Sequence, residues 1–460
     1  MNGFPTWEQL WRVLTLADFN TRVVVVGVAI LGAAAGIVGT FMLLRKRSLV
    51  SDAISHATLP GIVVAWLVMV ALGGTGKWLP GLLLGAAAGG LLAIAAILVI
   101  RSVGRLHEDT ALGVVLSVSF GVGVALLGVI QQMRNGSAAG LDTFIYGKTA
   151  SMLTADAVLI GVISLIIVVA SVALFKELNI LCFDSQFAAS QGLPIGLLDV
   201  VMMSLVVAVT VIGLQAVGLI LIVALLITPA AAARFWTHDL RKMTVLAAAI
   251  GGLGGFAGAG VSALVPRLPA GAVIVVTTSV GFVLSVLFGT RRGMVRMLLE
   301  RRRVNRRVAR QNLMRSLYEI AEDALGAAPS LDELSRVTTR HELEKRRAWS
   351  PRHLTRALRA ATRDLLIAAP ARDGDGGLRL TETGAVAARE IVRNHRLWEL
   401  YLIEYAHVAT SRVDRGADRI EHVLEPRIVA ELEELLQGQH SQEVQVAPSP
   451  HLLEARGGDS

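Results

Sequence analysis

The sequence predicts a mainly α-helical protein: a polytopic membrane bundle of about nine spans, followed by a soluble winged helix-turn-helix and a further helical segment. Three observations support this fold class. The 460-residue chain is 53% hydrophobic, and its long apolar runs all end before residue 291. Beyond that point Arg, Glu, Asp and Leu alternate without any long apolar run. A single cysteine, Cys182, excludes an internal disulfide and a Cys-based metal cluster.

A helix that crosses a bilayer needs roughly 20 mostly apolar residues. The candidate spans are residues 22–44, 57–73, 79–101, 109–130, 154–175, 196–215, 217–234, 243–265 and 271–290. The sixth and seventh are barely separated. Small residues recur within the spans, as in "GAAAGIVG" (32–39), and allow helices to approach closely. The sequence therefore indicates a compact helical bundle.

Basic residues in the short loops predict the orientation, because Lys and Arg favour the cytoplasmic side. If the N-terminus is outside, four basic clusters all lie on the cytoplasmic side of the membrane. They are Arg45–Arg47, Arg101 with Arg105, Arg241 with Lys242, and the region from Arg291 onward. Arg134 and Lys148 fall on the opposite side and do not fit. The spans are then expected in a bacterial-type plasma membrane, and the soluble C-terminal part is expected in the cytoplasm.

Two ionisable residues stand at the start of the second apolar run, in "LVSDAISHATLPGIVVAW" (49–66). Asp52 and His56 are four residues apart and share one helix face. A carboxylate and an imidazole can both ligate a first-row divalent metal. Alternatively, Ser51 or Asp52 caps the helix and His56 lies at the polar interface. Spacing alone leaves both interpretations open.

The stretch "RKRSLVSDAISHATLPGIVVAW" (45–66) resembles the signature of the membrane permeases of manganese, zinc and iron ABC importers. Three further motifs share the resemblance and its order: "DTFIYGKTASM" (142–152), "CFDSQFAASQGLP" (182–194) and "LQAVGLILIVALLITPAAAARF" (214–235). The resemblance implies that Asp52 and His56 line the path of a divalent metal substrate, Mn²⁺, Fe²⁺ or Zn²⁺, with manganese preferred. An ionisable pair within a bundle is costly without a role.

The chain carries no P-loop. The nearest match, "GGTGKW" (73–78), has Trp78 where Ser or Thr should bind Mg²⁺. ATP hydrolysis is therefore expected on a separate cytoplasmic ATP-binding subunit, and the chain itself is not expected to be an enzyme. The resemblance implies that the 179–194 loop carries the helix that docks on that ATPase. Its expected contacts are Asp184, Phe187, Ala188 and Gly192; the alternative is an ordinary loop.

Pro229 falls inside the seventh predicted span. A proline removes one helical hydrogen bond and can kink the helix. The resemblance implies a mobile helix near the gate. The alternative is a proline that neighbouring helices stabilise.

The region 291–315 contains ten arginines and one acid, Glu300. A basic helix leaving a membrane attracts anionic lipids, and contact with nucleic acid is the alternative. Beyond it, "SLDELSRV" (330–337) has the spacing of a capping box from Ser330 to Glu333. In "SPRHLTRALRAATRDLLI" (350–367), Ser350 is the expected cap, with Leu354, Leu358 and Leu365 facing inward. The outward arginines are Arg352, Arg356, Arg359 and Arg363.

With a Gly/Asp turn between short extended pieces at 369–384, these helices predict a winged helix-turn-helix whose arginine-bearing helix is the possible DNA contact. The next segment gathers imidazoles and carboxylates at helical spacing, which suits Mn²⁺ or Fe²⁺ better than structural zinc. The candidate ligands are His395, Glu399, Asp414, Asp418, Glu421 and His422. The alternative is a pair of solvated charged helices.

Residues 311–437 resemble the iron- and manganese-dependent repressors of the diphtheria-toxin-repressor type, through "HRLWELYL" and "RIEHVLEP". The resemblance implies a metal-binding and dimerisation segment. In that family the first helix contributes a methionine or carboxylate ligand, whereas Asn312 and Arg315 stand there in this chain. A degenerate sensor or a purely structural dimeriser is therefore also open.

The expected organisation is a transmembrane permease domain, a basic linker helix, a winged helix-turn-helix domain, a helical metal-binding/dimerisation segment and a disordered tail. Their bounds are residues 1–290, 291–310, 311–385, 386–437 and 438–460.

Two functions from different classes follow. The first is a metal-importer permease that assembles with an ATP-binding subunit, a second copy or a sister permease, and an extracytoplasmic metal-binding protein, and whose C-terminal domain senses metal. The second is a membrane-tethered, metal-dependent DNA-binding regulator. The coupling loop and the Asp52/His56 pair favour transport, because an anchor needs neither.

Overall fold

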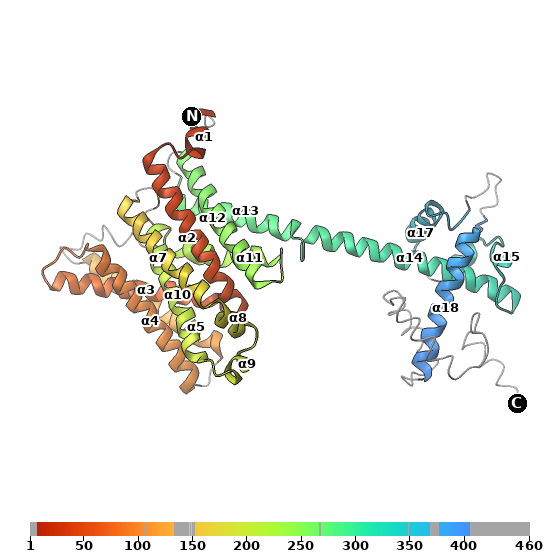
Figure 1. Cartoon of the computed structure of the whole chain (residues 1–460), viewed down its shortest axis with the longest axis horizontal. Coiled ribbons are helices and arrows are strands. Elements are labelled where there is room, and N and C mark those ends of the chain that lie inside the picture. Colours follow the sequence, from red (N-terminus) through yellow and green to blue (C-terminus); the bar gives the residue numbers. More distant parts are fainter. Residues whose placement is uncertain are drawn as a thin grey trace. The chain divides into compact units, whose positions relative to one another are not determined.

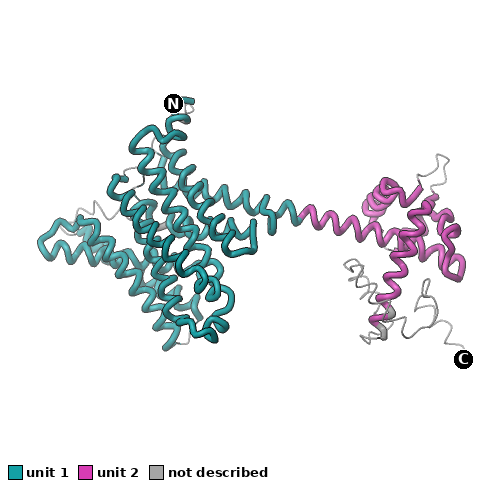
Figure 2. Tube along the Cα trace, viewed as in Figure 1, with its two compact units in different colours: residues 1–297 teal, residues 298–460 magenta. Residues whose placement is uncertain are grey.

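The computed structural model describes residues 7–104, 107–132, 147, 149, 152–265, 268–347, 349–368 and 377–404. The chain divides into two compact units, residues 1–297 and 298–460 (Figure 2). The boundary follows the change in composition near residue 291 and lies a few residues after it.

Unit 1 is a bundle of helices (Figure 1). Its helices are α1 (Trp7–Leu14), α2 (Phe19–Leu44), α3 (Ser48–Ala71), α4 (Leu79–Gly104), α5 (Glu108–Gln132), α7 (Thr154–Ala173), α8 (Phe175–Phe183), α9 (Ser185–Ser190), α10 (Ile195–Ala216), α11 (Leu219–Arg234), α12 (Leu240–Leu264) and α13 (Ala270–Phe288). Among the described residues, eight helices are long and apolar enough to cross a membrane.

The seventh expected span, 217–234, forms α11, which has only 16 residues. At 1.5 Å per residue it is about 24 Å long, shorter than the roughly 30 Å hydrocarbon core. Gly218 separates it from α10 with a φ of 94°, a left-handed conformation that glycine adopts without strain. Two residues, Val217 and Gly218, thus separate the helices that correspond to the barely separated sixth and seventh expected spans.

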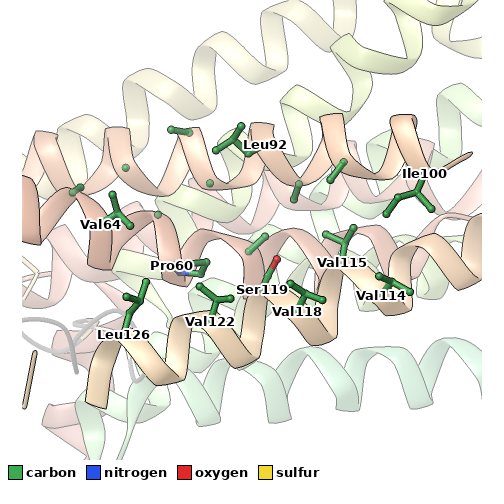
Figure 3. A pocket seen from close by; sticks show the side chains of 18 residues that line it. Pro60, Val64, Leu92, Ile100, Val114, Val115, Val118, Ser119, Val122 and Leu126 are labelled. Atoms are coloured by element: carbon green, nitrogen blue, oxygen red, sulfur yellow. The ribbon is translucent and has the colours of Figure 1, made fainter. Parts of the chain in front are cut away.

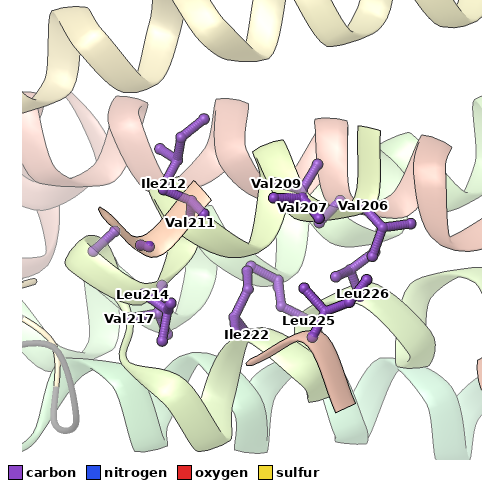
Figure 4. Close-up of a cluster of buried hydrophobic side chains, with 14 of the residues drawn as sticks. Val206, Val207, Val209, Val211, Ile212, Leu214, Val217, Ile222, Leu225 and Leu226 are labelled. Atoms are coloured by element: carbon purple, nitrogen blue, oxygen red, sulfur yellow. The ribbon is translucent and has the colours of Figure 1, made fainter. Parts of the chain in front are cut away.

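The core of unit 1 lies where α10 and α11 meet the surrounding helices (Figure 4). Val209, Val217, Ile222 and Leu226 are completely buried. The core residues are mostly β-branched or leucine, and close approach between other helices depends on glycine instead.

Helices α2 and α12 pack backbone to backbone through glycines. A Cβ on Gly32 would clash with the carbonyl oxygen of Gly251, one on Gly251 would clash with that of Gly32, and one on Gly36 would clash with that of Ala247. Small residues at such an interface allow van der Waals packing where lipid supplies no hydrophobic drive between helices. The small-residue motif of the sequence therefore has a specific location in the bundle.

We expect Gly36→Val to prevent correct packing, because the new side chain meets backbone that cannot move independently. Size-exclusion chromatography in detergent should show a large loss of monodisperse protein. Gly161→Val on α7 is the matched control, since no atom of the described residues lies within 4 Å of its ideal Cβ. Equal yields for the two variants would contradict the close contact.

Unit 2 contains most of α14 (Met294–Leu325), then α15 (Leu331–Leu334), α16 (Arg340–Arg346), α17 (Pro351–Arg363) and α18 (Glu382–Glu404). Its core includes Leu317, Tyr318, Leu343, Leu354 and Val392. In the described part of this unit the expected hairpin is reduced to two antiparallel bridges, which pair residues 338 with 378 and 367 with 380. Residues 369–376, the expected turn, lie outside the described part.

The helix caps of unit 2 follow the sequence. The capping box from Ser330 to Glu333 is present, and Ser350 accepts a hydrogen bond from the backbone N–H of His353. The backbone N–H of Ser330 donates to the Glu333 carboxylate and holds its pKa below the usual range. The prediction for Leu365 was wrong: α17 ends at Arg363, and Leu365 has a φ of 57° and is 72% exposed.

Candidate functional site

Asp52 and His56 lie in the first turns of α3, which begins at Ser48. The Nε2 atom of His56 is 3.6 Å from Oδ1 of Asp52. Their side chains are 22% (His56) and 38% (Asp52) exposed, and the imidazole packs edge-on against Phe120 of α5 with ring centroids 5.1 Å apart. Within the described part of the chain, the buried Nδ1 of His56 has no hydrogen-bond partner. The structure therefore brings the predicted pair together on one face, partly covered by α5.

Pro60, inside α3, adds a feature that the sequence analysis missed. Proline has no N–H, so the carbonyl of the residue four positions earlier loses its helical donor. That residue is His56. The four-residue spacing of His56 and Pro60 was visible in the sequence. It implies a lost hydrogen bond only because one continuous helix contains both residues.

The two side chains are too few to hold a metal by themselves. Structural and catalytic zinc sites use at least three protein ligands, and Mn²⁺ favours octahedral coordination. Among the described residues, no group of three or more His, Cys, Asp or Glu side chains lies close enough to hold an ion. Any metal at Asp52 and His56 needs donors besides the side chains of the described residues.

Between α7 and α10, the chain forms two short helices, α8 and α9. Asp184 caps α9: its Oδ1 accepts from the backbone N–H groups of Gln186 at 3.0 Å and Phe187 at 2.9 Å. Phe187 is 51% exposed, and Gly192 has a φ of 76° in open space. Ala188, by contrast, is completely buried. Of the four expected contacts, Phe187 is the one that offers a large apolar surface, while Asp184 and Ala188 fix the shape of the segment.

The α8–α9 segment is tied to the start of α3 by a cluster of ion pairs that the sequence analysis did not anticipate. Arg45 donates to the carbonyl of Leu181 in α8 at 3.1 Å and pairs with Asp199 of α10 at 3.2 Å. Arg47 lies 2.6 Å from the same carboxylate oxygen of Asp199. The Arg47 and Asp199 side chains are only 5% and 11% exposed.

The cluster continues to α4 and α5. Arg47 also pairs with Glu108 at 2.5 Å, and Arg101 pairs with Glu108 at 3.4 Å. Sequence reasoning used Arg45, Arg47 and Arg101 only as topology signals. Glu108 is 61 residues from Arg47, and Asp199 is 154 residues from Arg45. No local sequence pattern could therefore predict these pairs. Arg47, the N-cap residue of α3, thus pairs with residues of α5 and α10, and Arg45 and Arg101 extend the cluster to α8 and α4.

Cys182 lies in α8 beside this cluster. Burial raises the pKa of its thiol to about 12. A thiolate is the reactive and metal-binding form of cysteine, so the raised pKa disfavours both of these roles for Cys182.

Pro229 lies within the continuous helix α11. Its ring packs on α12, where Cγ is 3.4 Å from the ideal Cβ position of Gly251. Nearby, a Cβ on Gly39 of α2 would clash with the carbonyl oxygen of Leu226. The proline is therefore enclosed between α2 and α12, which leaves both the gate and the stabilised-proline interpretations available.

A cavity of about 560 Å³ lies between α3, α4 and α5 (Figure 3). It is lined by Pro60, Val64, Leu92, Val115, Val122 and other apolar or small residues, with Ser119 as the labelled polar side chain. Its lining contains no ionisable side chain. This cavity is therefore unsuited to a divalent cation and does not mark the metal path.

In unit 2, His395 and Glu399 lie on α18 and are 2% and 3% exposed. His395 Nε2 is 3.0 Å from Glu399 Oε1, and His395 Nδ1 is 3.1 Å from the Nη1 atom of Arg315 on α14. The other candidate ligands, Asp414, Asp418, Glu421 and His422, lie outside the described residues. The structure thus joins two of the six candidates and places an arginine beside them.

Helix α17 presents the expected basic face. Leu354, Ala357 and Ala361 are buried, and the four outward arginines are exposed. These are Arg352, Arg356, Arg359 and Arg363.

Comparison with known proteins identifies a family for unit 1 and a domain type for the C-terminal region. Residues 17–289 match the model of the ABC 3 transport family, which covers more than half of the chain. The chain belongs to the ABC 3 transport family. The match and the eight apolar helices make it a multi-pass permease of the bacterial inner membrane. Residues 381–443 match the iron dependent repressor, metal binding and dimerisation domain.

Relatives of this permease carry transport names. It is 35% identical over 410 residues to the manganese transport system membrane protein MntC of Bacillus subtilis (strain 168), covering 89% of each chain. It is 42% identical over 289 residues to the zinc transport system membrane protein TroC of Treponema pallidum (strain Nichols), covering 63% of this chain and 95% of the relative. The 410-residue match is longer than unit 1, so the B. subtilis similarity extends into unit 2.

A solved structure also resembles this permease. PsaBC from Streptococcus pneumoniae in complex with Fab matches with a TM-score of 0.54 and 29% identity, covering 63% of this chain and 98% of the other. The bundle of unit 1 is therefore the permease fold that the resemblance implied.

Proposed function

We propose that this chain is the membrane subunit of an ATP-driven importer of divalent transition metals, with manganese the first expected substrate, then iron and zinc. The observation that carries the proposal is the Asp52/His56 pair, an acid and an imidazole one helical turn apart in an otherwise uncharged helix. One buried nitrogen of the imidazole has no hydrogen-bond partner among the described residues. The relatives' names, which include manganese and zinc transport, support the substrate class.

The position of the pair fits passage toward the cytoplasm. Asp52 and His56 follow the start of α3 by four and eight residues, or about 6 and 12 Å along the helix. The start of α3 follows the basic residues Arg45–Arg47, which favour the cytoplasmic side. A metal bound there would have traversed most of the bilayer. The remaining part of its path to the cytoplasm would lie close to α8 and α9.

The α8–α9 segment is the proposed docking surface for a separate ATP-binding subunit. Its exposed apolar residue Phe187 offers a contact, and the buried ion pairs connect the segment to the first turn of α3. Movement of α8 would act on Arg45 through the Leu181 carbonyl and on Arg47 through Asp199. ATP-driven motion would thereby reach the residues next to Asp52.

Two ligands in one chain imply a pore shared by two permease subunits, either two copies of this chain or one copy and a sister permease. Facing pairs would bring two carboxylates and two imidazoles to one cation. An extracytoplasmic metal-binding protein would deliver the ion. The C-terminal unit would lie in the cytoplasm, where it could regulate transport, and the basic start of α14 would face anionic lipids.

Reconstitution tests the function directly. Proteoliposomes containing the permease and its ATP-binding subunit should accumulate Mn²⁺ in an ATP-dependent manner, in competition with Fe²⁺ and Zn²⁺ but not Mg²⁺. Accumulation that does not depend on ATP, or that is equal for Mg²⁺, would contradict the proposal.

The exposed arginine face of α17 favours a second candidate, a membrane-tethered DNA-binding regulator. If this is correct, the full chain in nanodiscs should bind duplex DNA with a steep salt dependence. Arg356→Ala combined with Arg359→Ala should weaken binding and lower the salt slope by about 2, one for each phosphate contact. The exposed Arg340→Ala on α16 serves as a control. Binding that is absent at low salt would exclude this candidate.

A further inference from the structure

The C-terminal match names a metal-binding domain, yet the two described candidate ligands do not form an open metal site. His395 and Glu399 are almost completely buried, and Arg315 of α14, 7% exposed, lies between them and Glu319. Arg315 Nε is 2.6 Å from Glu319 Oε1, and its Nη1 is 3.1 Å from His395 Nδ1. A chain of four side chains thus joins α14 to α18.

The contacts define the proton positions in this chain. A guanidinium can only donate hydrogen bonds, so the His395 Nδ1 atom facing Arg315 must accept. The imidazole is then neutral with its proton on Nε2, which donates to Glu399 Oε1 at 3.0 Å. A metal needs a free lone pair on an imidazole nitrogen. The lone pair of Nδ1 is engaged by Arg315, and Nε2 carries a proton.

The charges disfavour a metal as well. Arg315 is permanently protonated, so its positive charge lies in a buried region where a divalent cation would have to bind. Glu319, the α14 carboxylate that Arg315 contacts, also lies 3.4 Å from Arg346. Electrostatic repulsion in a low-dielectric interior is poorly screened.

A second pair joins the same two helices. Arg396 of α18 bonds to Glu322 of α14 at 2.5 Å, and its guanidinium lies over the Tyr318 ring at 5.7 Å. Both partners of this pair are nearly buried. The α14–α18 contact therefore contains one arginine–imidazole contact, Arg315 with His395, and one arginine–carboxylate pair, Arg396 with Glu322.

We propose that the Arg315 guanidinium takes the place of a bound divalent cation between α14 and α18, so that the His395–Glu399 pair is closed to metal and the two helices are joined without it. The C-terminal unit would then have lost metal dependence at this pair. This inference does not depend on the proposed transport function.

Manganese binding to the full chain in detergent tests the proposal, with free Mn²⁺ followed by its electron paramagnetic resonance signal. The parent protein and His395→Gln should bind the same amount of Mn²⁺ with the same affinity, whatever other sites the chain contains. Arg315→Glu should bind one additional ion, and Arg315→Glu combined with His395→Gln should lose it. Arg340→Glu, the same charge change at an exposed arginine, should gain none.

The outcomes separate cleanly. A tenfold or larger loss of Mn²⁺ affinity in His395→Gln alone would overturn the proposal, because the pair would then bind metal in the presence of Arg315. Unchanged stoichiometry in a folded Arg315→Glu protein would also overturn it. If Arg315→Glu does not fold, Arg315→Met gives the same test without a reversed charge. Variants at Asp52 and His56 report on transport and leave this comparison unaffected.

Discussion

Replacing Asp52 or His56 by alanine should lower metal uptake by on the order of 100-fold, because loss of a supporting outer-shell residue already costs 10–100-fold at metal sites and loss of a direct ligand should cost at least that. The two side chains lie 3.6 Å apart at the proposed cation position. Uptake of radioactive manganese in cells that lack their own importer, corrected for the amount of permease in the membrane, measures the effect.

The matched controls are Asp109→Ala and His107→Ala, which remove an exposed acid and an exposed imidazole from the same unit. They should retain uptake within about twofold. An Asp52→Ala, His56→Ala double variant should be no worse than either single variant, because residues that act as one unit are not additive. Normal uptake by His56→Ala would remove the chemical basis of the proposed transport path.

Asp199→Asn should destabilise the permease and uncouple ATP hydrolysis from uptake. The substitution leaves Arg45 and Arg47 without the carboxylate that pairs with both. Removing one partner of a buried ion pair costs about 3–5 kcal/mol, although Glu108, the second partner of Arg47, offsets part of this. Thermal unfolding in detergent should show a lower midpoint, and proteoliposomes should transport fewer ions per ATP hydrolysed.

A double-variant cycle separates the ion pair from a general loss of stability. Asp199→Asn combined with Arg47→Gln should be less destabilised than the sum of the single variants, because the second change removes the unpaired charge. Asp239→Asn, at an exposed cap of α12, is the control for loss of a carboxylate. Additive effects for Asp199 and Arg47 would show that the pair does not act as a unit.

The sequence predicted the membrane part of the fold well because long apolar runs have few alternatives to helices in a bilayer. Its error concerned length: 217–234 is apolar throughout, but Gly218 turns the chain and leaves α11 with 16 residues. In unit 2, the caps at Ser330 and Ser350 were predicted from local side-chain chemistry. The end of α17 was not, because Leu365 continues the apolar spacing while its backbone leaves the helix.

Candidate residues were predictable only as far as the interaction was local. Asp52 and His56 are one turn apart, so their proximity follows from helix geometry. Arg45 and Asp199 are 154 residues apart, and nothing in their separate neighbourhoods indicates a pair. Arg315 was recognised as an unusual residue in the sequence, but its contact with His395 depends on how α14 packs on α18, which periodicity does not specify.

The proline four residues after His56 has a bearing on selectivity. Since position 60 has no amide N–H, the His56 carbonyl oxygen receives no helical hydrogen bond from it, and we propose this oxygen as a further donor beside the imidazole and the Asp52 carboxylate. Two of three such donors would be hard oxygens, which suit Mn²⁺ better than Zn²⁺. On the proposed transport function, a main-chain oxygen would thus contribute to the discrimination between these two metals. Substitution of the side chains at positions 52 and 56 would leave that contribution in place.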